Sequence, residues 1–240
     1  MNTEPDLFEN YLTTSVLSLG PGKDKYEWYL KYFDYHLLPH FPKAKDSRIL
    51  ELGCGCGMNI SALMRNGYEN VSGVDISSEQ INCAKSKLGV ESVIVADAFK
   101  YLESNTEKYD VVLLIDILEH FDAEATVSFL KLVRSVLAKN GRVIIQTPCA
   151  FSAFMPNYFR DITHKRAYTP QSMTQTLLMS GYKQFRHYPL GTIPNGIKNG
   201  IRWALWNLLI VPAIYTFMLV AYGEDMGGIY TANMLTIVDA

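Results

Sequence analysis

The sequence lacks an excess of charge of either sign. Its 240 residues carry 22 lysines and arginines against 24 aspartates and glutamates, which gives a formal net charge of -2 at pH 7. Proteins that bind nucleic acid need many cations to neutralise phosphates, and these cations usually gather in a basic stripe. The chain as a whole shows neither an excess nor a stripe. We therefore expect no nucleic-acid partner.

The amino terminus lacks the apolar segment of a secretory signal, because the acidic start is followed by no such run. This absence predicts a cytoplasmic protein with free thiols. The four cysteines, Cys54, Cys56, Cys83 and Cys149, lack the spacing and the histidine partners of a zinc or redox site, so we assign no metal. Cys54 and Cys56 stand between glycines, where small packing residues suit a crowded turn.

Gly53, Gly55 and Gly57 follow an apolar run, a pattern that predicts a buried strand breaking into a tight turn at a nucleoside cofactor. Glycine permits unusual backbone dihedrals and close approach of a ligand, and Glu51 places a carboxylate just before the turn. A dinucleotide fingerprint starting at the first glycine needs a third glycine where Met58 stands, which weakens an NAD-dependent oxidoreductase. A glycine-rich turn without a ligand is the other alternative.

The pattern E-x-G-x-G-x-G over residues 51–57 resembles the first motif of class I S-adenosylmethionine (SAM) dependent methyltransferases. The resemblance implies an α/β fold with a doubly wound, Rossmann-like, seven-stranded sheet, in which the glycine turn lies under the methionine part of SAM. The following chain alternates strands and helices in the manner of βαβ units. We predict strands over Arg48–Leu52, Val71–Val74, Val93–Ala96, Tyr109–Ile115 and Gly141–Gln146, and helices over Met58–Arg65, Ser78–Leu88, Phe99–Leu102 and Ala123–Ala138.

Further elements flank this core. Periodicity predicts helices over residues 6–19 and 24–39; the second is rich in aromatics, which favours core packing over a lid on the cofactor. Asn140 and Gly141 are expected to cap the helix before the fifth strand. We also predict a helix over Pro170–Met179 capped by Thr169, and an antiparallel closing hairpin from Tyr182–Tyr188 and Ile229–Val238.

Several polar residues fall at strand ends, where an open α/β sheet binds its ligand. Asp75 ends the second strand about twenty residues after the glycine turn, which predicts contact with the ribose hydroxyls beside Ile76; a helix cap is the alternative. By resemblance, Asp97 and Ala98 form the adenine-binding corner, again with capping as the alternative. By the same resemblance, Asp116 lies beside the methionine part of SAM.

The connection over residues 147–169 leaves the carboxyl edge of the sheet and is expected to overhang the ligand crevice. His164 is our first candidate for the base that accepts the proton of an acceptor hydroxyl, with His120 and Asp161 in reserve. An equal alternative is that His164 only orders its loop. By resemblance, Glu119 also lies near the reaction.

Arg160, Lys165 and Arg166 form a basic cluster that suits a phosphate on the acceptor or a solvated loop. The phrase D-x-T-H-x-R-x-Y-T-P, which includes Tyr168 as a further substrate contact, resembles bacterial methyltransferases of cell-surface glycan clusters. It implies a small or lipid-linked acceptor, first of all a sugar hydroxyl. A quinone or phenol methyltransferase is the alternative, and a non-catalytic SAM-binding or membrane-scaffold protein is the alternative of another class.

Residues 195–223 form an apolar insertion long enough for a transmembrane helix. A single crossing conflicts with the return of the last strand to the same sheet, and Pro212 interrupts the run. Lys198 and Arg202, with Trp203 and Trp206 behind them, suit a lipid interface at the inner face of the membrane; a homodimer contact and packing within the chain are the alternatives.

The predicted organisation is therefore one methyltransferase domain. It comprises an N-terminal helical cap (1–45), a SAM-binding core (47–188), the apolar insertion (195–223) and a last strand (229–238). Methyl transfer from a sulfonium needs little covalent help, so positioning of donor and acceptor is expected to supply most of the rate.

Overall fold

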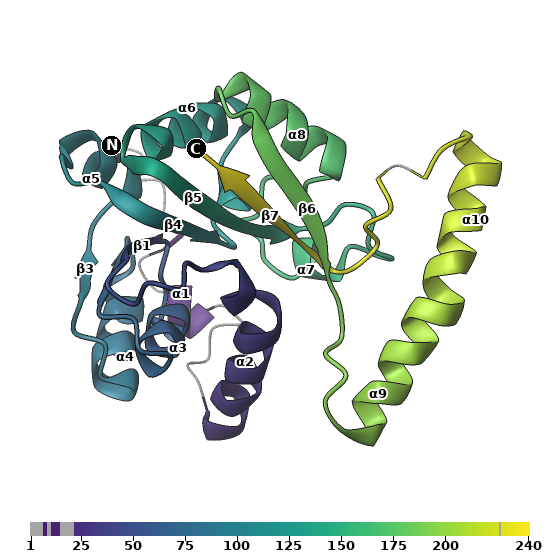
Figure 1. The fold of residues 1–240 in the computed structure, drawn as a ribbon, viewed down its shortest axis with the longest axis horizontal. Coiled ribbons are helices and arrows are strands. Elements are labelled where there is room, and N and C mark those ends of the chain that lie inside the picture. The colour runs from purple at the N-terminus through teal and green to yellow at the C-terminus, as the bar shows by residue number, and fades with distance from the viewer. Residues whose placement is uncertain (1–6, 9–10, 15–21, 226) are drawn as a thin grey trace.

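A seven-stranded sheet forms the centre of the molecule, with strand order β3-β2-β1-β4-β5-β7-β6 (Figure 1). The computed structural model describes residues 7–8, 11–14, 22–225 and 227–240. The neighbouring pairs among β1 to β5 are parallel, whereas β7 runs antiparallel to both β5 and β6. The predicted fold class is thus confirmed. The strands are β1 (Arg48–Leu52), β2 (Asn70–Asp75), β3 (Val93–Val95), β4 (Tyr109–Ile115), β5 (Leu137–Pro148), β6 (Gln184–Leu190) and β7 (Asn233–Asp239).

Helices cover both faces of this sheet, as expected where parallel strands read as continuous apolar runs. β4 illustrates the reason, because the side chains of Val111, Val112, Leu113 and Leu114 are all buried. Two apolar clusters result, one on each face. One face carries α2 (Lys23–His36), α3 (Met58–Arg65) and α4 (Ser78–Leu88), and the other carries α5 (Ala98–Ser104), α6 (Ala123–Ser135) and α8 (Pro170–Met179).

The start of β5 differs from the prediction. Leu137 already pairs with Tyr109, so α6 ends before this point and Asn140 and Gly141 do not cap it. Instead they form an irregularity within β5, where the register against β4 shifts. Asn140 has a left-handed φ of 63°, and a Cβ on Gly141 would lie 2.9 Å from the Ala138 carbonyl oxygen. The Asn-Gly turn is therefore used inside a strand.

The N-terminal segment is described only in part. Within the helix predicted over residues 6–19, Tyr11–Thr14 forms α1, and positions 6, 9–10 and 15–19 lie outside the described residues. The side chain of Thr13 donates to Glu79 at 2.8 Å, which joins α1 to α4. The second predicted helix is present as α2, followed by the short 3-10 helix η1 (Leu38–His40).

The apolar insertion is a continuous helix built from α9 (Gly196–Leu205), a π-helical turn η3 (Trp206–Ile210) and α10 (Val211–Tyr222). Figure 1 shows it standing beside the body, attached through the chain on either side. Pro212 does not end the helix, because the π turn before it alters the hydrogen bonding that proline interrupts. By length and composition its 27 residues could cross a membrane. The rest of the protein buries only 6% of its most apolar 18-residue stretch. The alternative of packing within the chain is therefore wrong.

The closing hairpin is shifted relative to the prediction. β6 starts two positions later than expected and extends to Leu190, and β7 starts at Asn233 rather than at Ile229. The segment before β7 is instead a connection: Thr231 accepts a hydrogen bond from the Leu190 amide and donates to the Asn233 carbonyl. Both ends of the insertion consequently leave and rejoin the same edge of the sheet, where Leu190 pairs with Asn233.

Candidate active site

The glycine turn between β1 and α3 has the backbone that only glycine adopts readily. Gly53, Gly55 and Gly57 have φ values of 74°, 53° and 72°. A Cβ on Gly53 would lie 3.0 Å from Ile117, and one on Gly57 would lie 3.1 Å from Ala84, so packing limits both positions. A Cβ on Gly55 would meet nothing nearer than 3.7 Å. Of the three glycines, Gly55 therefore has the least crowded surroundings, which suits a ligand-facing position.

Glu51 lies beneath this turn with an incomplete set of hydrogen bonds. Its side chain is buried, and Oε1 accepts from the Asn59 amide of α3, whereas Oε2 has no partner among the described residues. Burial raises the pKa of Glu51 to about 8, the Asn59 hydrogen bond lowers it and the Asp75 charge raises it. A buried carboxylate oxygen without a donor fits a cationic or N–H group of a bound ligand.

Asp75 at the end of β2 connects directly to the turn. Its Oδ2 accepts from the Gly55 amide and its Oδ1 from the Ser77 amide, both at 2.8 Å. The cap of α4 is Ser77, so the helix-cap alternative for Asp75 is not the one observed. Burial raises the pKa of Asp75 although both hydrogen bonds lower it. Each oxygen retains acceptor capacity for a hydroxyl, and Ile76 beside it is 47% exposed.

Asp97 and Ala98 lie at the end of the edge strand β3. Asp97 accepts from the Lys100 amide at 3.0 Å and is the N-cap of α5, whose first residue is Ala98. The capping alternative for Asp97 is therefore observed. Both residues are half-buried, and their contact with adenine stays a prediction.

Asp116 occupies a strained position at the end of β4. Its φ is 53°, unusual for a residue other than glycine, and its carboxylate accepts from the Gln146 amide at 3.0 and 2.9 Å. Burial raises the pKa of Asp116 to about 6, and the Gln146 hydrogen bond opposes this. Gln146 in turn accepts from the Tyr32 hydroxyl at 2.9 Å. The strand end is thus linked to α2.

The tyrosines of α2 were missed as site residues from the sequence. Tyr26, Tyr29 and Tyr32 recur every three positions, so they share one helical face. Their hydroxyls reach Ser61, Asn59 and Gln146, all polar side chains next to the turn or the strand ends. Phe33 of the same helix is fully buried in the core. The expectation of core packing therefore holds for only part of the aromatic set, and the period of three was the available signal.

The three predicted base candidates do lie together. His120 ends the 3-10 helix η2 (Leu118–His120), and its ring centroid lies 4.8 Å from that of His164. The Thr163 hydroxyl lies 2.9 Å from His120 Nδ1 and donates to Asp161 at 2.6 Å, and Asp161 also accepts from Tyr11. His164 Nδ1 lies 3.0 Å from the Tyr158 carbonyl oxygen. Since a carbonyl only accepts, Nδ1 carries the proton and Nε2 of a neutral His164 is a proton acceptor.

The electrostatics of this cluster are governed by burial. Burial and the nearby His164 lower the pKa of His120 to about 4, so it is neutral at pH 7. Burial raises the pKa of Glu119 well above its ordinary value, and the charge of Asp116 adds to the effect. Burial acts to raise the pKa of Asp161, but hydrogen bonds from Thr163 and Tyr11 outweigh it, and the net shift is downward.

The predicted substrate contacts separate into two groups. Arg160 and Lys165 are exposed, and Arg166 is half-buried with its guanidinium 5.4 Å from the centre of the Tyr168 ring. Tyr168 itself is 0% exposed, and its hydroxyl lies near Thr126 and the Leu118 carbonyl. Tyr168 therefore supports the loop from within the core. The prediction that it contacts the substrate is wrong, because its side chain is fully buried. Burial of its long apolar ring explains the difference.

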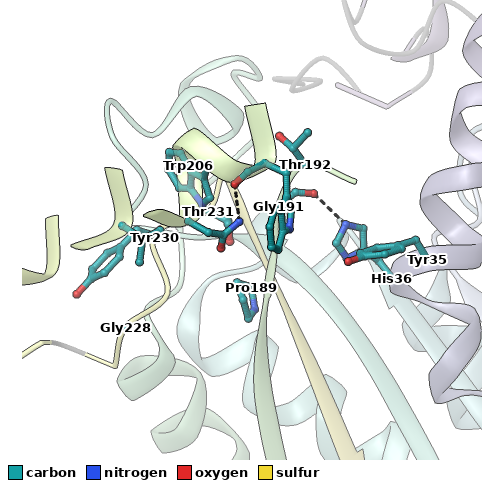
Figure 2. Close-up of a pocket in the computed structure, with 12 residues that line it drawn as sticks. Tyr35, His36, Pro189, Gly191, Thr192, Trp206, Gly228, Tyr230 and Thr231 are labelled. Carbon is teal, nitrogen blue, oxygen red and sulfur yellow. Dashed lines mark hydrogen bonds between the residues drawn. The ribbon is translucent and has the colours of Figure 1, made fainter. Parts of the chain in front are cut away.

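A pocket of about 250 Å³ lies where α2, the end of β6 and the apolar helix approach one another (Figure 2). Figure 2 shows Tyr35 and His36 on one side and Trp206 and Tyr230 on the other. His36 Nε2 lies 2.9 Å from the Gly191 carbonyl oxygen, which fixes α2 to this edge. Because α2 also carries Tyr32, one helix joins the pocket to the strand end beside Asp116.

Together the sheet order and the glycine turn define an α/β domain with a nucleoside-cofactor site at the carboxyl ends of its parallel strands. A model of the methyltransferase domain matches residues 27–184. The chain belongs to this methyltransferase domain family, which sets aside the oxidoreductase alternative.

Individual relatives are more distant. The chain is 32% identical over 104 residues to a ubiquinone biosynthesis O-methyltransferase of Aeromonas salmonicida, covering 42% of each chain. It is 27% identical over 112 residues to an N-terminal Xaa-Pro-Lys N-methyltransferase 1 of Danio rerio, covering 45% of this chain and 50% of that one. The chain thus spans about half the length of the curated relatives it matches. A SAM-dependent methyltransferase from Archaeoglobus fulgidus has the same fold, with a TM-score of 0.65, 21% identity and 98% of both chains covered.

Proposed function

We propose that this protein transfers a methyl group from SAM to a hydroxyl of a lipid-linked or lipid-soluble acceptor. SAM is supported by the glycine turn and by Glu51 beneath it. The Oε2 atom of Glu51 has no hydrogen-bond donor among the described residues. Glu51 would hold the amino group of SAM, Gly55 would allow its close approach, and Asp75 would accept from the ribose hydroxyls. The bound cofactor supplies an electrophilic methyl group on a sulfonium.

The chain's own contribution is to hold the acceptor and to accept its proton. His164 Nε2 is the acceptor nitrogen in this proposal, because Tyr158 holds the proton on Nδ1. The link from His120 through Thr163 to Asp161 positions the neighbouring ring. Exposed Arg160 and Lys165 on the same loop suit an anionic group of the acceptor.

The cofactor is tested by calorimetric titration of the full chain with SAM and, as a competitor class, NAD. Gly55→Val places a branched side chain at the least crowded of the three glycines of the turn, so SAM binding is expected to weaken at least about 100-fold. Gly67→Val is the matched control, because Gly67 also has a positive φ of 83° but meets nothing within 4 Å. If folded wild-type protein binds no SAM, or if the Gly55→Val variant binds as wild type does, the proposed cofactor site is wrong.

Two acceptor classes compete. A sugar hydroxyl on a lipid carrier is supported by the resemblance of the loop phrase around His164 and by the exposed cations beside it. A quinol or other phenol is supported by the ubiquinone O-methyltransferase relatives and by the aromatic lining of the pocket. Transfer of labelled methyl from SAM is measured with a polyprenyl-diphosphate-linked oligosaccharide and with a demethylated benzoquinol, each in detergent micelles. Methylation of only one identifies the class, and methylation of neither contradicts a lipid-borne acceptor.

We further propose that the helix over residues 196–222 lies on the inner face of the membrane and brings the pocket to a lipid-borne acceptor. Leu208, Phe217 and Val220 are 69%, 62% and 83% exposed, so several sides of the helix are apolar and open. A protein groove would cover one stripe, whereas lipid can surround a helix. Lys198 and Arg202 near its start suit anionic headgroups.

Flotation with vesicles containing phosphatidylglycerol tests this placement. The double variant Leu208→Glu/Val220→Glu is expected to lose most vesicle binding, while the control Leu178→Glu/Met179→Glu on α8 retains it. These control positions are 55% and 61% exposed on the body. Equal flotation of wild type and the helix variant would overturn the proposal. The homodimer alternative would hold instead if the wild type were a dimer that does not bind vesicles and the helix variant were a monomer.

A further inference from the structure

Glu119, His120 and His164 form a cluster of potential metal ligands at the acceptor end of the site. One ligand atom from each residue lies within 4.8 Å of the other two. Glu119 and His120 come from η2 and His164 comes from the long loop, so the fold brings together residues distant in the chain. No metal was predicted from the sequence, because the four cysteines have no histidine pair near them and the spacing of Glu119, His120 and His164 along the chain does not resemble a metal site.

Glu119 lacks the partners that a buried carboxylate needs. It is 0% exposed, and neither Oε1 nor Oε2 has a hydrogen-bond partner among the described residues. His164 Nε2 lies 4.0 Å from Oε1, which is too long for a hydrogen bond. Buried carboxyl groups are ordinarily hydrogen-bonded or coordinate metals, so an unpartnered carboxyl group beside two imidazoles fits a cation bound among the three side chains.

We propose that Glu119, His120 and His164 bind one divalent transition-metal ion. Two imidazoles and one carboxylate suit Mn²⁺, Fe²⁺, Co²⁺ or Zn²⁺, whereas Mg²⁺ and Ca²⁺ prefer oxygen ligands throughout. Three protein ligands leave coordination positions open, as in a catalytic rather than a structural site. The ligands of this site are nitrogen and oxygen atoms, and no cysteine takes part.

The surroundings of the two histidines resemble the support of metal ligands. The Tyr158 carbonyl accepts from His164 Nδ1, which turns Nε2 toward Glu119. The Thr163 hydroxyl lies 2.9 Å from His120 Nδ1 and is itself held by Asp161, which leaves Nε2 as the coordinating nitrogen of His120. Ligating histidines commonly bond through their other nitrogen in this way, and loss of such a partner weakens metal binding 10–100-fold.

Binding requires the cluster to contract. A metal about 2.1 Å from each donor brings the donors to ~3.4 Å from one another, so the atoms now up to 4.8 Å apart must approach by up to ~1.4 Å. Glu119 and the loop are already joined, because the Glu119 backbone carbonyl accepts from the Lys165 amide at 2.7 Å. The contraction therefore takes place between two segments that a backbone hydrogen bond already holds together.

A bound ion would change the chemistry of the proposed function, on which this consequence rests. With Nε2 of His164 engaged as a ligand, the acceptor hydroxyl would coordinate the ion, its O–H bond would break as its oxygen–metal bond shortens, and the proton would leave to water. The acceptor oxygen would then bond to the methyl carbon of SAM as the bond from that carbon to the sulfonium sulfur breaks, and S-adenosylhomocysteine would leave. Metal binding itself does not depend on SAM or on any acceptor.

The test uses the full chain, freed of metal with a chelator and titrated with Co²⁺, whose visible absorption reports its coordination. We expect one ion per chain with bands typical of nitrogen and oxygen ligands. His164→Ala and Glu119→Gln are expected to weaken binding at least 10-fold, and Thr163→Val 10–100-fold. His40→Gln is the matched control, because it removes one of the five histidines of the chain at a position outside the cluster.

The outcomes separate this inference from the proposed function. Folding of each variant is checked by circular dichroism, and SAM titration reports separately on the other end of the site. Absence of Co²⁺ binding in protein that still binds SAM would overturn the metal site alone, as would equal affinity in wild type and His164→Ala or a thiolate-type spectrum. Co²⁺ binding as expected in protein that binds no SAM would support the metal site and overturn the proposed cofactor.

Discussion

Two buried glutamates mark the two ends of the candidate site, and the chain provides for them differently. Glu51 has one oxygen bonded to Asn59, a residue of the helix that follows its own strand. Glu119 has no bonded side-chain oxygen among the described residues, and its closest partner comes from a distant loop. One oxygen of the Glu51 carboxyl group is therefore paired within its own β–α unit, whereas neither side-chain oxygen of Glu119 is paired among the described residues.

The largest expected difference between the two glutamates is the contribution of Glu51 to the pH dependence of the free energy of unfolding. Its folded pKa of about 8 exceeds the ordinary value, so the folded chain holds a proton that the unfolded chain has released. This contribution is fully present below the unfolded pKa and is lost as the pH rises through 8. Glu51→Gln removes it, so the wild-type minus variant free energy of unfolding is expected to fall by up to ~1.4 kcal/mol per pH unit.

Chemical denaturation of both proteins at several values from pH 5 to pH 8.5 measures this difference. The difference is needed because Asp116, with a pKa of about 6, and Glu119 add slopes of the same sign in both proteins. A difference that stays constant over the whole range would mean that Glu51 is charged in the folded state at neutral pH.

Replacing each glutamate by methionine compares the two ends directly. Glu119→Met removes an unpaired buried carboxylate, so the metal-free chain is expected to gain stability or to stay unchanged. Glu51→Met leaves the Asn59 amide without its acceptor, which costs about 1–3 kcal/mol. We expect the Glu119 variant to exceed the Glu51 variant by at least ~1 kcal/mol in urea denaturation with a chelator present. Equal stabilities would show that the carboxylates are equally satisfied.

Local sequence patterns were sufficient for the cofactor end. The bounds of β1, α3, α4, β4 and α8 match their predictions, because each is set by neighbouring residues: an apolar run, a glycine turn, or a cap such as Thr169. Asp75 ends its strand as expected because a parallel strand must end at this edge. The positive φ of three glycines likewise follows from their identity.

The acceptor end depended on contacts between distant segments, which periodicity does not report. His120 and His164 were both selected, yet nothing in their spacing placed Glu119 between them. The Asn140 turn was read as a helix end because the same residues suit a bulge within a strand. The composition of the apolar helix suited a lipid interface, a homodimer contact or packing within the chain, and only the fold shows that the body covers little of it.

A smaller effect on stability is expected from the Thr163 hydroxyl, which links His120 to Asp161 at the acceptor end. Thr163→Val keeps the shape of the side chain but removes the hydroxyl between His120 and Asp161. Loss of these hydrogen bonds is expected to cost about 1–2 kcal/mol in the free energy of unfolding. Thr216→Val on the exposed helix, where the hydroxyl bonds only the Pro212 carbonyl, is expected to change it by less than ~0.5 kcal/mol. Equal losses would show that the Thr163 link has no special weight.

The smallest effect concerns the support of Glu51 from α2. Tyr29 donates to the Asn59 oxygen, and the Asn59 amide donates to Glu51, so the hydroxyl orients the amide that Glu51 uses. Tyr29→Phe is expected to cost ~1 kcal/mol in denaturation and to weaken SAM binding several-fold, since the carboxylate loses an oriented partner. Tyr35→Phe is the control, because Tyr35 lies on the same helix but beside the pocket. If both variants weaken SAM binding alike, α2 acts on the cofactor site through its position as a whole rather than through the Tyr29 hydroxyl.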